Sequence, residues 1–158
     1  MKNTFKRSGA ALISLVLLLV LAVSAGAANS QNVGVKFWKE RSDKESMANS
    51  GIDSNRTATL TRQANGTYTL TLPVMQVSKL GVTGYLSGLT IGDVIYDGTL
   101  TGDFNKATAV LTIKNLPASV LTGSDVNKSV LVTCNIQMDL QVLGEINTSA
   151  RMCIWNQK

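Results

Sequence analysis

The segment Val130–Trp155 reads VLVTCNIQMDLQV, then LGE, then INTSARMCIW. From Val132 to Val142, apolar and polar side chains alternate strictly, which places every second residue on one face of an extended chain. The apolar face carries Val130, Val132, Cys134, Ile136, Met138, Leu140 and Val142. This pattern predicts a strand with one buried face, and the short connection through Gly144 predicts a hairpin with the residues that follow. We call Val130–Trp155 the terminal ribbon and expect any binding site to use it.

The first 28 residues have the layout of a secretory signal peptide. Three basic side chains precede the uncharged apolar run Ala10–Val23, and small residues follow it at Ser24–Ala28. The run is shorter than the roughly 18 to 20 residues that a spanning helix needs. We therefore expect cleavage near Ala27 or Ala28. The mature domain, residues 29–158, is then secreted or held at the cell surface without a membrane span.

The charge balance argues against a nucleic-acid partner. The full chain of 158 residues has 15 basic and 10 acidic side chains, but Lys2, Lys6 and Arg7 belong to the predicted signal peptide. Without them, 12 basic and 10 acidic side chains remain and are spread along the sequence. Nucleic-acid binding calls for a concentrated basic patch, so we exclude that class of partner.

Enzyme chemistry finds little support in the residues. The chain contains no histidine, which removes His-dependent triads, His-metal sites and imidazole proton shuttles. The carboxylates are scattered, and no pair suggests acid/base catalysis. Asp97, Asp103 and Asp125 stand in expected turns, where aspartate is common for local reasons. We therefore predict neither an enzyme nor a metal site.

The rest of the chain reads as short strands. Residues 32–38, 57–62, 67–75 and 107–113 are extended segments, and Leu80–Val94 is expected to hold two kinked strands. Asn65-Gly66 between two alternating runs is a strong hairpin signal. Ser46 could cap a short helical turn that ends at Gly51. Many short strands without a long helical period predict an all-β sandwich or barrel.

Four segments together carry a resemblance to a known family. They are KESMANSGI at Lys44–Ile52, NGTYTLTL at Asn65–Leu72, GYL at Gly84–Leu86 and ARMCIW at Ala150–Trp155. In this order and spacing they resemble the NEAT (near-iron transporter) domains of exported Gram-positive proteins. The resemblance spans roughly Val33 to Trp155 and implies an immunoglobulin-like β-sandwich of about eight strands, with a short 3₁₀ or α turn near Ser46–Asn49.

The resemblance also implies a haem groove between that turn and the terminal ribbon. Ser46 would contact a propionate and Met47 would pack on the porphyrin. The candidate groove residues are Ser46, Met47, Tyr85, Met138, Ala150 and Met152. Haem-binding members of the family supply iron with a tyrosine from a Tyr-x-x-x-Tyr pair on the last hairpin, but this chain has no tyrosine after Tyr96. Met138 or Met152 could ligate iron softly, but a methionine on an apolar strand face is usually a core residue.

The two cysteines lie on adjacent strands of the ribbon, and an exported chain can form a disulfide. Cys134 and Cys153 are therefore a candidate pair. Paired positions of an antiparallel hairpin have a constant sum, and both apolar faces are even-numbered, so regular alternation puts these two residues on opposite faces. A one-residue bulge near Arg151 would bring them to one face.

Two hypotheses for the function remain. In the first, the protein captures haem or a host haemoprotein outside the cell for iron uptake, with haem as its cofactor. In the second, the same fold serves a non-haem interaction or adhesion with another surface protein.

Overall fold

The structure is a computed structural model and describes residues 29–79, 81–139 and 145–158. The predicted signal peptide, residues 1–28, lies outside these described residues. Within the described ranges, no helix has the length and apolar character needed to cross a membrane.

Nine antiparallel strands and four short 3₁₀ turns make up the described structure. The strands are β1 (Asn29–Lys39), β2 (Ala58–Arg62), β3 (Tyr68–Pro73), β4 (Val77–Lys79), β5 (Val82–Ile91), β6 (Val94–Thr101), β7 (Val110–Leu116), β8 (Val130–Met138) and β9 (Glu145–Asn156). The turns are η2 (Met47–Gly51), η3 (Phe104–Lys106), η4 (Ala118–Val120) and η5 (Val126–Lys128). The all-β prediction is confirmed.

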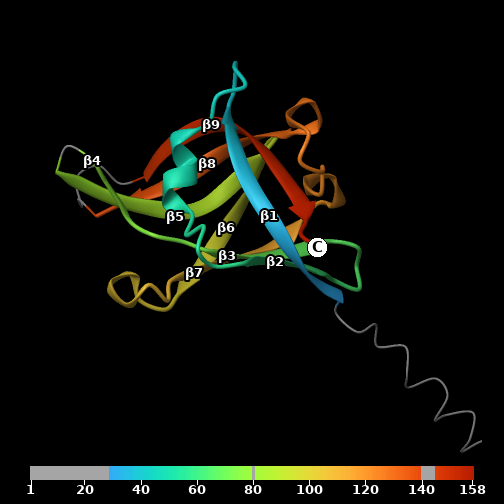
Figure 1. The fold of residues 1–158 in the computed structure, drawn as a ribbon, viewed down its shortest axis with the longest axis horizontal. Helices are drawn as coiled ribbons and strands as arrows, with labels where there is room; N and C mark the ends of the chain where they lie inside the picture. The colour runs from blue at the N-terminus through green and yellow to red at the C-terminus, as the bar shows by residue number, and fades with distance from the viewer. Residues whose placement is uncertain (1–28, 80, 140–144) are drawn as a thin grey trace, which may run out of the picture.

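Eight of these strands close into a barrel, and β4 is an extra strand beside β5 (Figure 1). The order is β5-β6-β7-β3-β2-β1-β9-β8, and β8 pairs back to β5. The sandwich expected from the resemblance is therefore corrected to a closed barrel. The reason is a long-range pairing: Gly84–Thr90 of β5 pairs with Thr133–Met138 of β8, which joins two edges that a sandwich leaves apart.

A bulge allows β5 to bend into this closure. The β5–β8 register shifts between Leu86 and Gly88. A Cβ atom at Gly88 would lie 2.7 Å from the carbonyl oxygen of Tyr96, so only glycine fits at this close crossing. The sequence predicted two kinked strands in this segment, whereas the structure has one bent strand, β5. A kink does not specify the distant partner strand, so the sequence left sandwich and barrel open.

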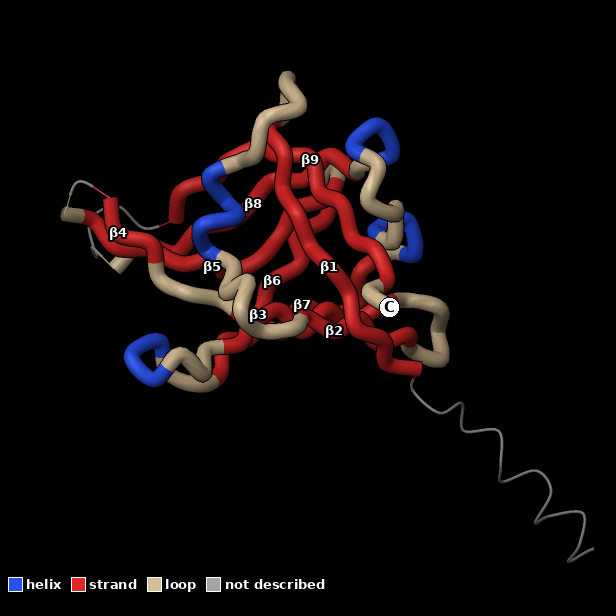
Figure 2. Tube along the Cα trace, viewed as in Figure 1, coloured by secondary structure: helices blue, strands red, loops and turns tan. Residues whose placement is uncertain are grey.

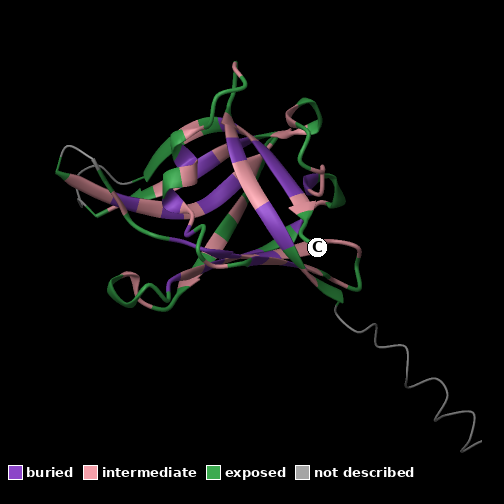
Figure 3. Cartoon of the chain, viewed as in Figure 1, coloured by how far each residue is buried: buried purple, intermediate pink, exposed green. Residues whose placement is uncertain are grey.

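The core fills the barrel interior with alternate residues of facing strands (Figure 3). Its largest fully buried side chains include Phe37, Leu60, Leu111, Met152 and Ile154. The Asn65-Gly66 hairpin joins β2 to β3, as predicted, with Gly66 at φ 84° and the Asn65 carboxamide oxygen accepting a hydrogen bond from the Thr67 amide at 3.1 Å. These elements provide the rigid frame of the site.

Candidate functional site

The turn η2 is fixed in place by two polar side chains. Ser46 is its N-cap, with Oγ accepting a hydrogen bond from the Ala48 amide at 3.3 Å. Asn49 binds the backbone of β1 on both sides of one residue: its Oδ1 accepts from the Phe37 amide at 2.8 Å, and its Nδ2 donates to the Phe37 carbonyl at 2.7 Å. Asn49 thus makes the hydrogen bonds to β1 that a neighbouring strand would otherwise make, and it holds η2 against β1.

A groove lies between η2, β4, β5 and the terminal ribbon, where Figure 2 shows the η2 turn crossing over β5. Its volume is about 270 Å³, just below the roughly 300–1,000 Å³ typical of small-molecule sites. The lining residues are Met47, Ala48, Gly51, Val77, Val82, Gly84, Tyr85, Leu86, Ile136, Met138, Ile146 and Thr148. None of them is charged, so the groove suits an apolar ligand.

The groove opens where β1 stops. β1 pairs with β9 only from Ala150 to Asn156, because β1 ends at Lys39. Towards Glu145, no β1 residue lies beside β9, and the chain instead continues through a loop into η2. The inward side chains of the ribbon at this end, Ile146 and Thr148, therefore line the groove instead of the core.

The groove wall depends on close backbone approach at Gly84. Gly84 pairs with Met138 across β5 and β8. A Cβ atom at Gly84 would lie 2.8 Å from Sδ of Met138 and 2.9 Å from the carbonyl oxygen of Gln137. Glycine at this position therefore lets the Met138 side chain lie across β5 and form part of the apolar wall.

The structure divides the candidate groove residues into three groups. Met47, Tyr85 and Met138 line the groove. The Tyr85 ring packs against Phe104, with ring centroids 5.2 Å apart. Ser46 is half-buried and caps η2 beside the groove without lining it.

Ala150 and Met152 do not reach the groove. Both are fully buried in the core, and Met152 lies opposite Phe37 of β1 and Val130 of β8. They share the inward face of β9 with Ile146 and Thr148 but lie deeper along it. The sequence shows which residues share that face, and the end of β1 decides which of them meet the groove.

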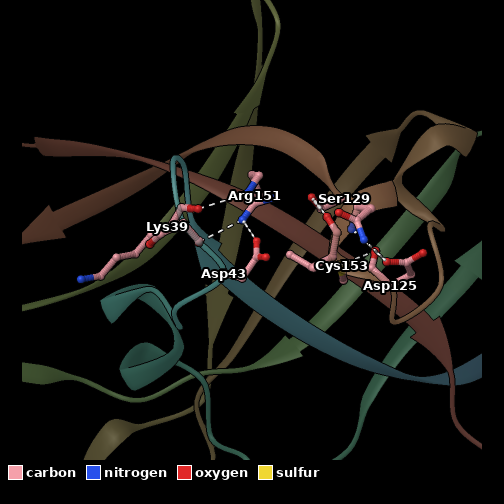
Figure 4. A network of polar contacts seen from close by, with 9 residues as sticks. Lys39, Asp43, Asp125, Ser129, Arg151 and Cys153 are labelled. Atoms are coloured by element: carbon pink, nitrogen blue, oxygen red, sulfur yellow. Dashed lines mark hydrogen bonds and ion pairs between the residues drawn. The ribbon is translucent and has the colours of Figure 1, made fainter.

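The predicted disulfide is wrong, and both cysteines are free. β8 and β9 pair without a register shift from Val130↔Met152 to Gln137↔Glu145, so Cys134 faces Thr148. Without the expected bulge, Cys134 and Cys153 point to opposite faces. Burial raises the pKa of the Cys134 thiol to about 12. The Cys153 thiol instead donates to the Asp125 carbonyl at 3.6 Å, beside Ser129 (Figure 4).

Arg151 ties the loop before η2 to β9. Its guanidinium pairs with the Asp43 carboxylate at 2.7 Å, and donates to the Lys39 carbonyl at 3.1 Å and the Ser42 carbonyl at 2.9 Å (Figure 4). The segment Ala150–Trp155 therefore supports the site by holding its loop, and not by lining it. Sequence reasoning did not assign this role to Arg151.

No protein-family model matches the chain, and no curated protein sequence is similar to it. Among solved structures, the chain resembles the NEAT5 domain of IsdX2, a B. anthracis hemophore, in complex with heme: identity is 11 %, the TM-score is 0.50, and the match covers 84 % of this chain and 99 % of that one. A mutant of the same domain in complex with heme matches with 12 % identity and a TM-score of 0.53, covering 84 % and 98 %. The protein therefore has a NEAT-like fold.

Proposed function

We propose that this protein is an exported binding module that captures haem in the groove between η2 and the terminal ribbon. One observation carries the proposal: an uncharged groove lies where the sequence resemblance expects the haem site, between Met47 of η2 and Ile146 of β9. The fold shared with two haem-bound NEAT structures gives it further support.

The physical basis of the capture is burial of a flat apolar ring. Aliphatic side chains line both sides of the groove, including Val77, Val82 and Ile136. Each 100 Å² of apolar surface removed from water favours binding by about 2.5 kcal/mol, before the cost of association. A porphyrin ring has a large apolar surface of this kind, and a ligand wider than the cavity can extend to solvent along its open side.

The residues of the groove fit the porphyrin ring better than they fit the iron. When bound, haem would supply a metal centre that can accept ligands from the protein. The described lining offers it the thioethers of Met47 and Met138, which are soft and weak ligands, and no thiolate or imidazole. The proposed role is therefore binding, without a catalytic step.

A second candidate is a non-haem protein-interaction module. Val94 and Ile95 at the start of β6 are 53 % and 64 % exposed, and neither lines the groove. Successive strand residues point to opposite faces, so Ile95, the more exposed of the two, would take part in such a contact on its own face of the sheet. Under this alternative, Ile95→Glu abolishes partner binding and groove variants do not.

Titration of the mature protein with hemin tests the first proposal, with Ile146→Glu as the groove variant. A saturable Soret change is expected for the native protein. The variant should bind hemin about tenfold or more weakly, because a carboxylate placed beside a bound apolar ring loses hydration. Ile146 is 44 % exposed, so this change should leave the fold intact.

Leu131→Glu is the matched control. Leu131 is another exposed aliphatic residue of the terminal ribbon, at 56 %, but it lies outside the groove. Equal hemin binding by the two variants, or no saturable binding by the native protein, would remove the proposal.

A further inference from the structure

The groove offers no strong donor for ferric iron among the described residues. The sequence has no histidine. Of the three tyrosines, Tyr68 and Tyr96 do not line the groove. Tyr85 belongs to the groove wall, but it stands between the buried residues Gly84 and Leu86 of β5, so strand alternation turns its ring to the other face of the strand. There the ring packs at 46° against Phe104, which does not line the groove. No aspartate or glutamate lines it either. Leu80 and residues 140–144, outside the described structure, add no histidine, tyrosine, cysteine or acidic side chain to the sequence.

The two thiols are also unsuited to the task. Cys134 is fully buried and does not line the groove. Its raised pKa, about 12, keeps it a neutral thiol at physiological pH, whereas iron binding needs the thiolate. Cys153 points to the opposite face of the ribbon, where its thiol hydrogen bonds to Asp125.

What remains near a bound ring is sulfur, hydrocarbon and the neutral hydroxyl of Thr148. The thioethers of Met47 and Met138 suit soft metal ions, and ferric iron prefers anionic oxygen or nitrogen donors. The gain from placing the iron in this groove is therefore small beside the gain from burying the ring. A ligand that keeps the ring and lacks the iron loses little.

We infer that the groove recognises the porphyrin ring and not its metal, so that metal-free porphyrins are ligands of the same affinity class as haem. This inference rests on the proposed capture of haem in the groove. It adds a class of ligand, the dianionic metal-free porphyrins. It also means that iron coordination does not decide which porphyrins the groove binds.

Parallel titrations of the mature protein with hemin and with protoporphyrin IX test the inference, the first by absorbance and the second by porphyrin fluorescence. The two dissociation constants are expected to agree within about threefold, less than 1 kcal/mol. Protoporphyrin IX should displace hemin from a preformed complex. Ile146→Glu should weaken both ligands by the same factor, and Leu131→Glu should weaken neither.

A Met138→Leu variant separates ring contact from metal contact. Leucine keeps the volume and removes the sulfur, so the affinities for hemin and for protoporphyrin IX should shift together. The inference is overturned if hemin binds more than about tenfold tighter than protoporphyrin IX and Met138→Leu closes that gap. The proposed capture of haem would then still hold, with iron coordination as the main source of its affinity. If neither ligand binds, both the proposed function and this inference fail.

Discussion

The two ends of β9 carry the same kind of side chain on the same face and meet opposite surroundings. At one end, Ile146 is 44 % exposed and lines the groove, whereas at the other end Met152 is fully buried. β1 pairs with β9 from Ala150 onward and ends before it reaches Ile146. The site therefore arises from the length of a neighbouring strand and not from a special residue in β9.

The strongest test of this contrast is truncation at both ends. Met152→Ala should lower the free energy of unfolding by about 2–5 kcal/mol, because it leaves a cavity between Phe37 and Val130. Ile146→Ala should cost below about 1 kcal/mol, since its side chain already contacts water. Urea unfolding of both variants measures the difference. Equal losses would mean that the groove end is packed like the core.

The next test removes the Asn49 side chain, which holds η2 against β1 beside the groove. Asn49→Ala should cost about 1–3 kcal/mol, because the amide and carbonyl of Phe37 both lose a partner. Hemin affinity should fall with it, since η2 is no longer fixed against β1. Asn49→Asp is the informative companion: it keeps the acceptor for the Phe37 amide and loses the donor. If Asn49→Asp lowered the free energy of unfolding as much as Asn49→Ala, the hydrogen bond from the Phe37 amide to Asn49 would make no separate contribution to stability.

A smaller effect is expected at Arg151, which holds the loop before η2. Arg151→Gln should cost about 1–2 kcal/mol, through loss of charged hydrogen bonds to the Lys39 and Ser42 carbonyls and of the pair with Asp43. Thermal unfolding at low and high salt measures it. Asp43→Asn is the control: Asp43 is an exposed partner, so its change should cost less than that of Arg151. If Asp43→Asn cost more stability than Arg151→Gln, the ion pair between Arg151 and Asp43 would be the main contact.

Near neutral pH the smallest effect is expected at Cys134, in β8 of the terminal ribbon. Its thiol should resist iodoacetamide in the native protein at pH 8 and react after unfolding, and reducing agent should leave the native mass unchanged. The raised pKa also makes stability fall at high pH. Below about pH 9 the thiol is neutral in both states and contributes no pH dependence; from there to about pH 12 only the unfolded state releases the proton. If a Cys134→Ser variant kept the same decrease of stability with pH, that decrease would come from other groups.

Much of the fold could be read from local patterns. The alternation in Val130–Val142 predicted β8, Asn65-Gly66 predicted the β2–β3 hairpin, and Ser46 predicted the cap of η2. The predicted strand residues Leu140 and Val142 and the connection at Gly144 lie outside the described residues. Each is a short-range property, because hydrophobic period, turn residue and cap act within a few positions. The same parity argument placed Cys134 and Cys153 on opposite faces, and the structure has no bulge between β8 and β9 to overrule it.

The candidate site was predicted only in part, for a physical reason. Met47 and Met138 were proposed and do line the groove, but Ala150 and Met152 lie in the core, and Val77, Val82, Ile146 and Thr148 were not singled out. Which residues of β9 line the groove depends on where β1 ends. That is a contact between residues more than a hundred positions apart, and no local pattern contains it.

The sequence by itself determined most of the strands, the inward faces of β8 and β9, and the capped turn, since these follow from side-chain period and short-range hydrogen bonds. It did not predict that Val82–Ile91 forms one strand or that Asp97 lies in β6 and not in a turn. The tertiary structure decided the rest. It closed the barrel through the β5–β8 pairing, held two thiols apart and left one end of the terminal ribbon without β1. All three depend on long-range pairing of strands, whose register is set by the whole fold and not by any one segment.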